Sequence, residues 1–179
     1  MRSRLSLTAL ALVAGLSLSP AAGIAQPSED SQASKVLASG GAGFNVAAVQ
    51  SLINRGDAAV AAGNLAEARK DYDNARAAAK QLLAFYRDLS GAFRGLDARI
   101  PREMDAKGRA ALGLLAEANL RLAALFRRQN QPEVAVPVLV EVVRLMTPSQ
   151  AQGQKAYQSL VELGFVETPF AAAKTAPGS

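Results

Sequence analysis

The densest group of charged side chains in the sequence surrounds a segment that glycine and proline interrupt. Segments of this kind, set between regular elements, often carry binding residues. We expect three basic side chains to form a docking surface for a partner that bears carboxylates: Arg94, Arg99 and Arg102. The simpler alternative is a solvated helix start, in which Glu103 and Asp105 complement the positive end of the helix.

The same segment offers no acid/base pair, because residues two apart on a helix do not face each other, as Glu103 and Asp105 would have to. The chain also contains no His and no Cys. These absences remove imidazole acid/base chemistry, thiol nucleophiles, disulfides and the usual zinc ligands. We therefore predict a non-catalytic protein with no cofactor and no metal site, and keep an enzyme that relies on carboxylates, Lys, Tyr or Ser as the third alternative.

The charge balance does not favour nucleic acid as the partner. The chain has 20 basic and 15 acidic residues, a net charge of +5, and the two signs alternate along the sequence. The adjacent Arg127 and Arg128 suit the carbonyl end of a helix. No aromatic residues interleave with the basic ones, as single-strand binding would require. The expected partner is another protein or a peptide.

The N-terminal residues have the three-part pattern of a secretory signal peptide. Residues 1–4 are basic, residues 5–18 are uncharged and largely apolar, and small residues follow up to Ala25. This run is shorter than the roughly 20 residues that a spanning helix needs. We predict a signal peptide over 1–25, cleaved after Ala25 or Gly23, and therefore export. An uncleaved anchor is the alternative, and a lipid anchor is not expected because the chain has no Cys.

The elements that must position these residues are expected to be helices. Half of the residues are apolar, only 5% are aromatic, and the helix formers Ala and Leu dominate. Apolar residues recur in a seven-residue rhythm typical of packed helices. Its members are Leu65, Ala68, Tyr72, Ala75, Ala79, Leu82, Tyr86 and Leu89, then Met104, Gly108, Ala111, Leu115, Ala118, Leu122 and Leu125.

Caps and breakers divide residues 44–170 into five expected helices. The first follows the N-cap Asn45 and stops at Gly63, the second begins near Leu65, and the segment 90–100 breaks the pattern. The third has Pro101 in its first turn, the fourth opens at Pro132, and the fifth covers about 149–163. No stretch alternates with period two, so we predict an all-α domain. Residues 26–43 are interpreted as a flexible leader and 171–179 as a disordered tail.

The first expected hairpin resembles a tetratricopeptide repeat, whose pattern of small, apolar and aromatic residues it matches. The matching residues are Gly56, Ala59, Gly63, Leu65, Ala68, Tyr72 and Ala75. A degenerate second copy is formed by Ala123, Phe126, Asn130, Pro132, Ala135, Leu139 and Val142. The resemblance implies a right-handed stack of antiparallel helix hairpins over 44–170. The alternative is a generic antiparallel bundle rich in Ala and Leu.

In that family the first helix of each repeat lines a concave groove, which implies a peptide-binding face here. By the family's register this face carries Gln50, Asn54, Asp57 and Ala61 from the first copy and Glu117, Arg121, Ala124 and Arg128 from the second. The family's carboxylate clamp of Lys, Asn and Arg is not matched, because Asp57 and Glu117 occupy places that need neutral or basic side chains.

A second resemblance concerns residues 85–109 and 164–170, which look like segments of uncharacterised exported proteins of cyanobacteria. It implies the periplasm or the thylakoid lumen as the destination. With the features above, it leads us to expect a scaffold or assembly factor for other periplasmic, lumenal or membrane proteins. The alternative is a stable accessory subunit, peripherally associated with a membrane complex such as a photosynthetic one.

Overall fold

The computed structural model describes residues 44–170, and this part of the chain is helical without any strand. It contains five helices: α2 (Val46–Ala61), α3 (Leu65–Ala92), α4 (Arg99–Arg128), α5 (Pro132–Met146) and α6 (Ala151–Glu162). The prediction of an all-α domain is thereby confirmed. The predicted signal peptide (1–25), leader (26–43) and tail (171–179) lie outside the described residues.

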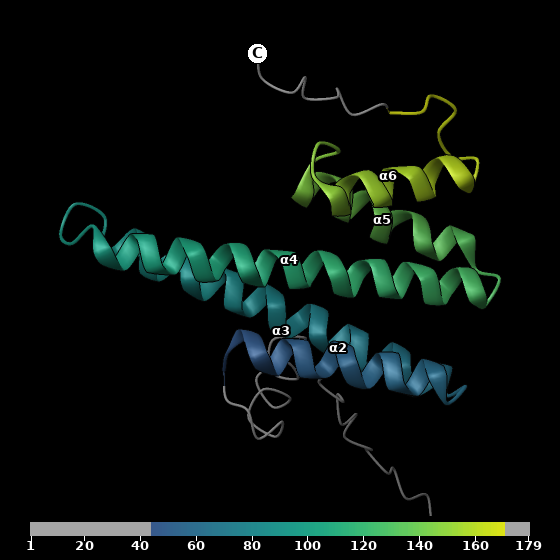
Figure 1. Cartoon of the computed structure of the whole chain (residues 1–179), viewed down its shortest axis with the longest axis horizontal. Helices are drawn as coiled ribbons and strands as arrows, with labels where there is room; N and C mark the ends of the chain where they lie inside the picture. Colours follow the sequence, from purple (N-terminus) through teal and green to yellow (C-terminus); the bar gives the residue numbers. More distant parts are fainter. Residues whose placement is uncertain (1–43, 171–179) are drawn as a thin grey trace, which may run out of the picture.

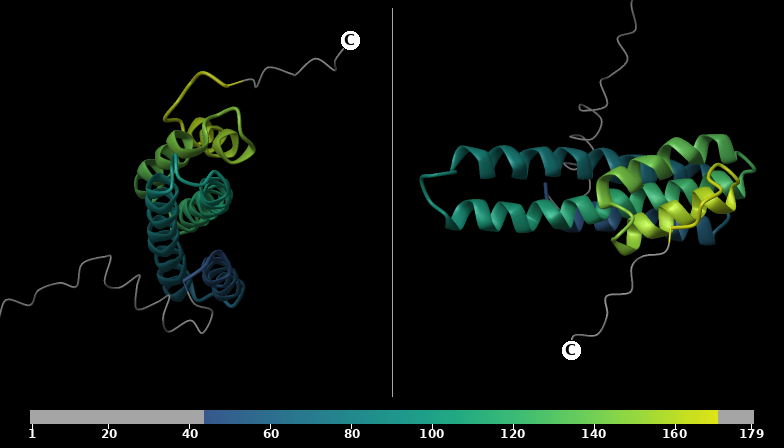
Figure 2. Two further views of the ribbon diagram at one scale, coloured as in Figure 1. Left: turned by 90° about the vertical axis from the view of Figure 1, so that its left-hand side faces the viewer. Right: turned by 90° about the horizontal axis from the view of Figure 1, so that it is seen from above.

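Consecutive helices run in opposite directions and each packs on the next (Figure 1). The most extensive packing joins α3 to α4, and α4 also contacts α2 and α6. Seen end-on, α2 and α6 lie on opposite sides of the assembly (Figure 2). The packing is therefore compatible with a stack of hairpins. None of these five helices is long and apolar enough to cross a membrane.

The predicted helix ends owe their positions to particular caps and turns. The Asn45 side chain accepts a hydrogen bond from the Ala48 N–H at 2.9 Å and so caps α2. The turn between α2 and α3 places Gly63 at a φ of +78°, where a side chain is disfavoured. The turn between α4 and α5 uses Asn130 at a φ of +58°, which Asn tolerates better than most residues. Pro132 is the first residue of α5, as predicted.

The predicted break at 90–100 is too wide. Helix α3 continues through Gly91 to Ala92, and α4 already begins at Arg99. Ser90 is buried, and its hydroxyl donates a hydrogen bond to Asp105 of α4 at 2.8 Å, which joins the two helix ends. Pro101 is tolerated as the third residue of α4 because the first four N–H groups of a helix have no partner within it.

The apolar core consists of two clusters. The first joins α2 to the middle and C-terminal parts of α3, from Ala75 to Tyr86, and to the N-terminal and middle parts of α4, from Met104 to Ala118. The second joins the N-terminal half of α3 and the C-terminal half of α4 to α5 and α6. Every position of the predicted seven-residue rhythm is buried except Leu65 and Leu89, which are partly buried. The rhythm therefore identified the seam along which α3 and α4 pack.

Asn119 of α4 is the exception within this seam, because it is fully buried and its amide makes no hydrogen bond to any part of residues 44–170. We expect Asn119→Leu to raise the free energy of unfolding by about 1–2 kcal/mol, because a buried amide without a partner costs about 1–3 kcal/mol. Leucine keeps the four side-chain heavy atoms and their branching. Urea denaturation measures the change, and a lower free energy of unfolding would contradict it.

Helices α3 and α4 have 28 and 30 residues, about twice the length of their neighbours at 16, 15 and 12. Their joined ends therefore extend past the other helices, at the left of Figure 1 and in the right-hand view of Figure 2. We call the α3–α4 hairpin from Leu83 to Leu112 the arm. It contains the charged segment singled out from the sequence.

Candidate functional site

The predicted groove face brings together side chains from three helices. Asp57 of α2 accepts a hydrogen bond from the Tyr72 hydroxyl of α3 at 2.6 Å. The Nε of Arg121 on α4 donates to the two carboxylate oxygens of Asp57 at 2.9 and 3.3 Å, and its Nη2 reaches Glu117 at 3.4 Å. Burial, followed by the hydrogen bond to Asp57, raises the pKa of Tyr72, so its hydroxyl stays a donor.

The other members of this face take no part in that network. Asn54 is exposed and accepts a hydrogen bond from Gln50 of the same helix at 3.1 Å. Arg128 is exposed at the end of α4, and Ala61 and Ala124 are exposed as well. The polar groups at the centre of the face, on α2, α3 and α4, therefore form hydrogen bonds and ion pairs with one another. Their arrangement suits holding three helices together better than gripping a peptide.

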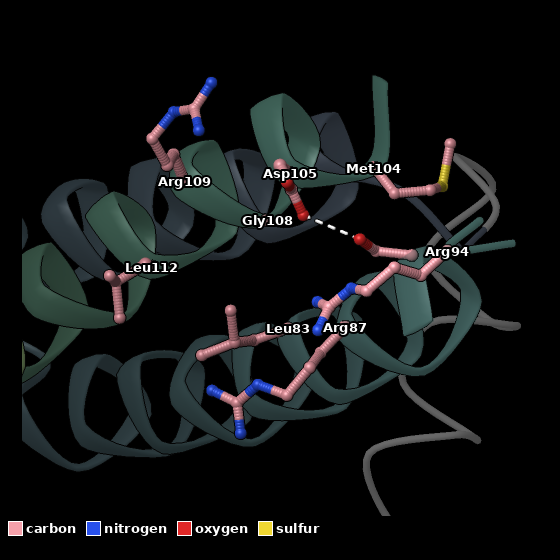
Figure 3. Close-up of a pocket in the computed structure, with 9 residues that line it drawn as sticks. Leu83, Arg87, Arg94, Met104, Asp105, Gly108, Arg109 and Leu112 are labelled. Carbon is pink, nitrogen blue, oxygen red and sulfur yellow. Dashed lines mark hydrogen bonds between the residues drawn. The ribbon is translucent and has the colours of Figure 1, made fainter. Parts of the chain in front are cut away.

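The arm contains a pocket of about 260 Å³ between α3 and α4. Of the three arginines predicted to dock a partner, Arg94 alone lines it. The lining consists of Leu83, Arg87, Ser90, Arg94, Met104, Asp105, Gly108, Arg109 and Leu112. In Figure 3, Arg94 reaches along the groove toward Leu83, while Arg109 stands on α4 and points away from α3. Arg87 and Arg94 thus border a largely apolar floor from the α3 side, and Arg109 lines it from α4 with its guanidinium directed outward.

Arg99 and Arg102 lie outside the pocket lining. Arg99 is already engaged: its Nη2 donates to Asp97 at 2.7 Å, and its Nε donates to the same carboxylate at 3.1 Å. These hydrogen bonds lower the pKa of Asp97. Arg102 is exposed on the first turns of α4. The structure therefore retains one of the three predicted arginines in the pocket.

Sequence reasoning missed Arg87 and Arg109 as lining residues. A signal for Arg109 was present, because it belongs to the charged segment singled out from the sequence, seven residues after Arg102. Arg102 nevertheless lies outside the lining, so that spacing alone does not identify the pocket. Arg87 precedes the charged segment, and Arg94 follows the end of α3, so helical spacing does not relate these two.

The arm carries more positive charge than its own carboxylates neutralise. Six basic residues lie in it: Arg87, Arg94, Arg99, Arg102, Lys107 and Arg109. Its four carboxylates are those of Asp88, Asp97, Glu103 and Asp105. Asp97 pairs with Arg99, and Glu103 pairs with Lys107 at 2.6 Å. Within residues 44–170, the other four arginines of the arm form no ion pair. They are therefore free to bind an external anion.

The polar side chains that line the pocket are mostly basic. Its lining contains a single carboxylate, Asp105, which accepts the hydrogen bond from Ser90. No cluster of three acidic side chains that could hold a metal ion occurs in the described part of the chain. The volume of about 260 Å³ also lies below the roughly 300–1,000 Å³ of pockets for drug-sized ligands. A single anchoring side chain fits this size better than a cofactor does.

Comparisons with family models, with curated proteins and with solved structures gave no match. The tetratricopeptide resemblance therefore rests on the sequence motifs described above. The function has to be argued from the arm and from the charges it presents.

Proposed function

We propose that this chain is a protein–protein interaction module that holds its partner through the arm. The observation that carries the proposal is the set of unpaired arginines around an apolar pocket, at the end of the hairpin that extends past the other helices. Arginine suits protein contacts because its planar guanidinium binds carboxylates through two hydrogen bonds. The centres of protein–protein interfaces are rich in apolar residues and in arginine, and the pocket with its arginines has this composition.

The module acts as a non-catalytic scaffold or assembly factor in an extracytoplasmic compartment, the periplasm or the thylakoid lumen. The signal-peptide pattern of residues 1–25 supports export. The lack of His and Cys and the single carboxylate in the pocket support binding rather than catalysis. The hairpin plan supports a scaffold, since stacked helix pairs present extended surfaces to partners.

Reversing the charge of the three pocket arginines tests the proposal. In the triple variant Arg87→Glu, Arg94→Glu, Arg109→Glu, recovery of crosslinked partner from the protein's own cell should fall about tenfold or more, since a single hot-spot arginine contributes about 2 kcal/mol or more and about 1.4 kcal/mol is tenfold in affinity. The matched control makes the same charge change at exposed cations outside both the arm and the predicted groove face: Lys70→Glu, Arg144→Glu and Lys155→Glu. It should leave recovery unchanged.

Far-UV circular dichroism and a melting curve show whether both triple variants are folded. Unchanged recovery with the arm variant would remove the arm from the partner contact. An equal loss with the control would mean that net charge, and not the pocket, governs recovery. Co-migration of all the protein with one large membrane complex on native gels would identify a permanent accessory subunit in place of a free scaffold.

A further inference from the structure

We infer that the arm pocket accepts one large apolar side chain flanked by carboxylates, so the partner presents an acidic segment with an apolar anchor. The inference rests on the proposed function and adds the chemistry of the partner. It is carried by the apolar floor, by the positions of three unpaired arginines and by the volume of the pocket.

The floor supplies the apolar half of the match. Leu83 of α3 and Leu112 of α4 lie on opposite sides of the groove, and Met104 is largely buried at the end nearer the loop. The flexible thioether chain of methionine adapts well to an inserted aliphatic or aromatic side chain. The volume of about 260 Å³ leaves room for one such group rather than for a long apolar stretch.

The arginines supply the charged half. Arg94 extends along the groove above the floor, whereas Arg87 and Arg109 stand on different helices at its two sides (Figure 3). An anchor seated between the helices therefore has the Arg94 guanidinium over the floor and Arg87 on the α3 side, while the Arg109 guanidinium points away from α3. Carboxylates before and after the anchor in the partner's sequence would each meet one of these guanidinium groups, with paired hydrogen bonds that a simple point charge does not provide.

Asp105 supplies a repulsive element within the same pocket. Its carboxylate is held in place by the hydroxyl of Ser90, which is 3% exposed, and it forms no ion pair with the neighbouring arginines. A carboxylate of the partner is repelled near Asp105 and attracted near Arg87 and Arg94. Repulsion of this kind contributes to specificity because it disfavours a wrong register of the bound segment.

A protein segment fits these features better than an anionic membrane does. Membrane surfaces attract lysine and arginine alike as point charges. In the arm, however, the unpaired cations are all arginines, and the one lysine, Lys107, is bound by Glu103. The apolar groups of the pocket are also recessed between two helices, where a flat bilayer would not reach them.

The experiment titrates the purified full-length protein with fluorescein-labelled peptides and follows fluorescence anisotropy. The reference peptide has Leu between two pairs of Glu. Two controls replace either every Glu by Gln or the Leu by Ser. Each control should bind about tenfold more weakly or worse, and added salt should weaken the reference peptide most. Arg94→Lys should reduce affinity for the reference peptide several-fold, and Asp105→Asn should increase it.

Equal binding of the reference and Gln peptides would overturn the inference, and so would equal binding of the Leu and Ser peptides. Arginine-dependent co-sedimentation with phosphatidylglycerol vesicles, without peptide binding, would overturn it in favour of a membrane. The two proposals fail separately. If the arm variant loses its crosslinked partner but the protein binds none of the peptides, the proposed function stands and only the acidic segment with an apolar anchor is ruled out. If the protein binds the reference peptide but no protein partner depends on the arm, the proposed function is ruled out and the chemistry of the pocket stands.

Discussion

Replacing Tyr72 by alanine should lower the free energy of unfolding by about 3–5 kcal/mol, the range for deleting a large aromatic side chain from a core. The residue is 2% exposed and belongs to the second apolar cluster. Its ring lies directly against Gly56 of α2, where an added Cβ would come within 2.4 Å of the ring carbon Cε1. Removing the ring therefore leaves a cavity where α2, α3 and α4 meet.

The matched variant is Tyr72→Phe, which keeps the ring and removes only the hydroxyl that donates to Asp57. Loss of one such hydrogen bond costs about 0.5–1.5 kcal/mol. Urea denaturation of both variants gives the two differences. If the phenylalanine variant loses as much as the alanine variant, the hydroxyl, and not the packing of the ring, joins these helices.

The second large effect is expected from Gly153→Ala in α6. A Cβ at this position would lie 1.9 Å from the carbonyl oxygen of Thr147 and 2.6 Å from its carbonyl carbon. Both are backbone atoms, so neither can rotate away as a flexible side chain would. We expect a loss of about 3 kcal/mol or more, at the upper end of overpacking effects, because the α5–α6 turn must shift.

Gly113→Ala in α4 is the control for this substitution. Apart from its chain neighbours and the backbone of its own helix, no heavy atom lies within 4 Å of the Cβ that it would add. Alanine in a helix interior is favoured over glycine by about 0.5–1 kcal/mol, so this variant should gain stability. Thermal and urea unfolding would show opposite signs for the two glycines. Two changes of the same sign would mean that helix propensity, and not the close approach to Thr147, governs Gly153.

Most of the fold could be predicted from the sequence, because the buried residues of long helices recur at regular intervals along the chain. The seven-residue rhythm fixed the buried seam of α3 and α4, and Asn45, Gly63 and Pro132 fixed helix ends through their local backbone preferences. The predicted break began too early, near Gly91, because the packing of α3 on α4 outweighs the low helix propensity of glycine. A glycine near a helix end costs little, and the contact of Ser90 with α4 extends the pairing of the two helices.

The site was only partly accessible because it depends on distances between elements. Arg94 and Arg99 look equivalent in the sequence, yet Arg99 binds the carboxylate of Asp97, two residues before it, and Arg94 turns into the groove. The pairing of Asp57 with Arg121 joins residues 64 positions apart. The family's register placed both residues on one face, but their direct pairing follows from how closely α2 rests against α4, which the residue pattern does not contain.

The unequal lengths of the helices have a mechanical consequence. Near the loop at 93–98, α3 and α4 support each other without a third helix outside them, whereas both core clusters are held from several directions. The first cluster nevertheless reaches into the arm through Tyr86 and Met104, with Leu89 and Ile100 packed against it, so the two helix ends are tied to the core. A contact surface placed there stands clear of α5 and α6 and is largely preformed, which lowers the entropy lost when a segment binds.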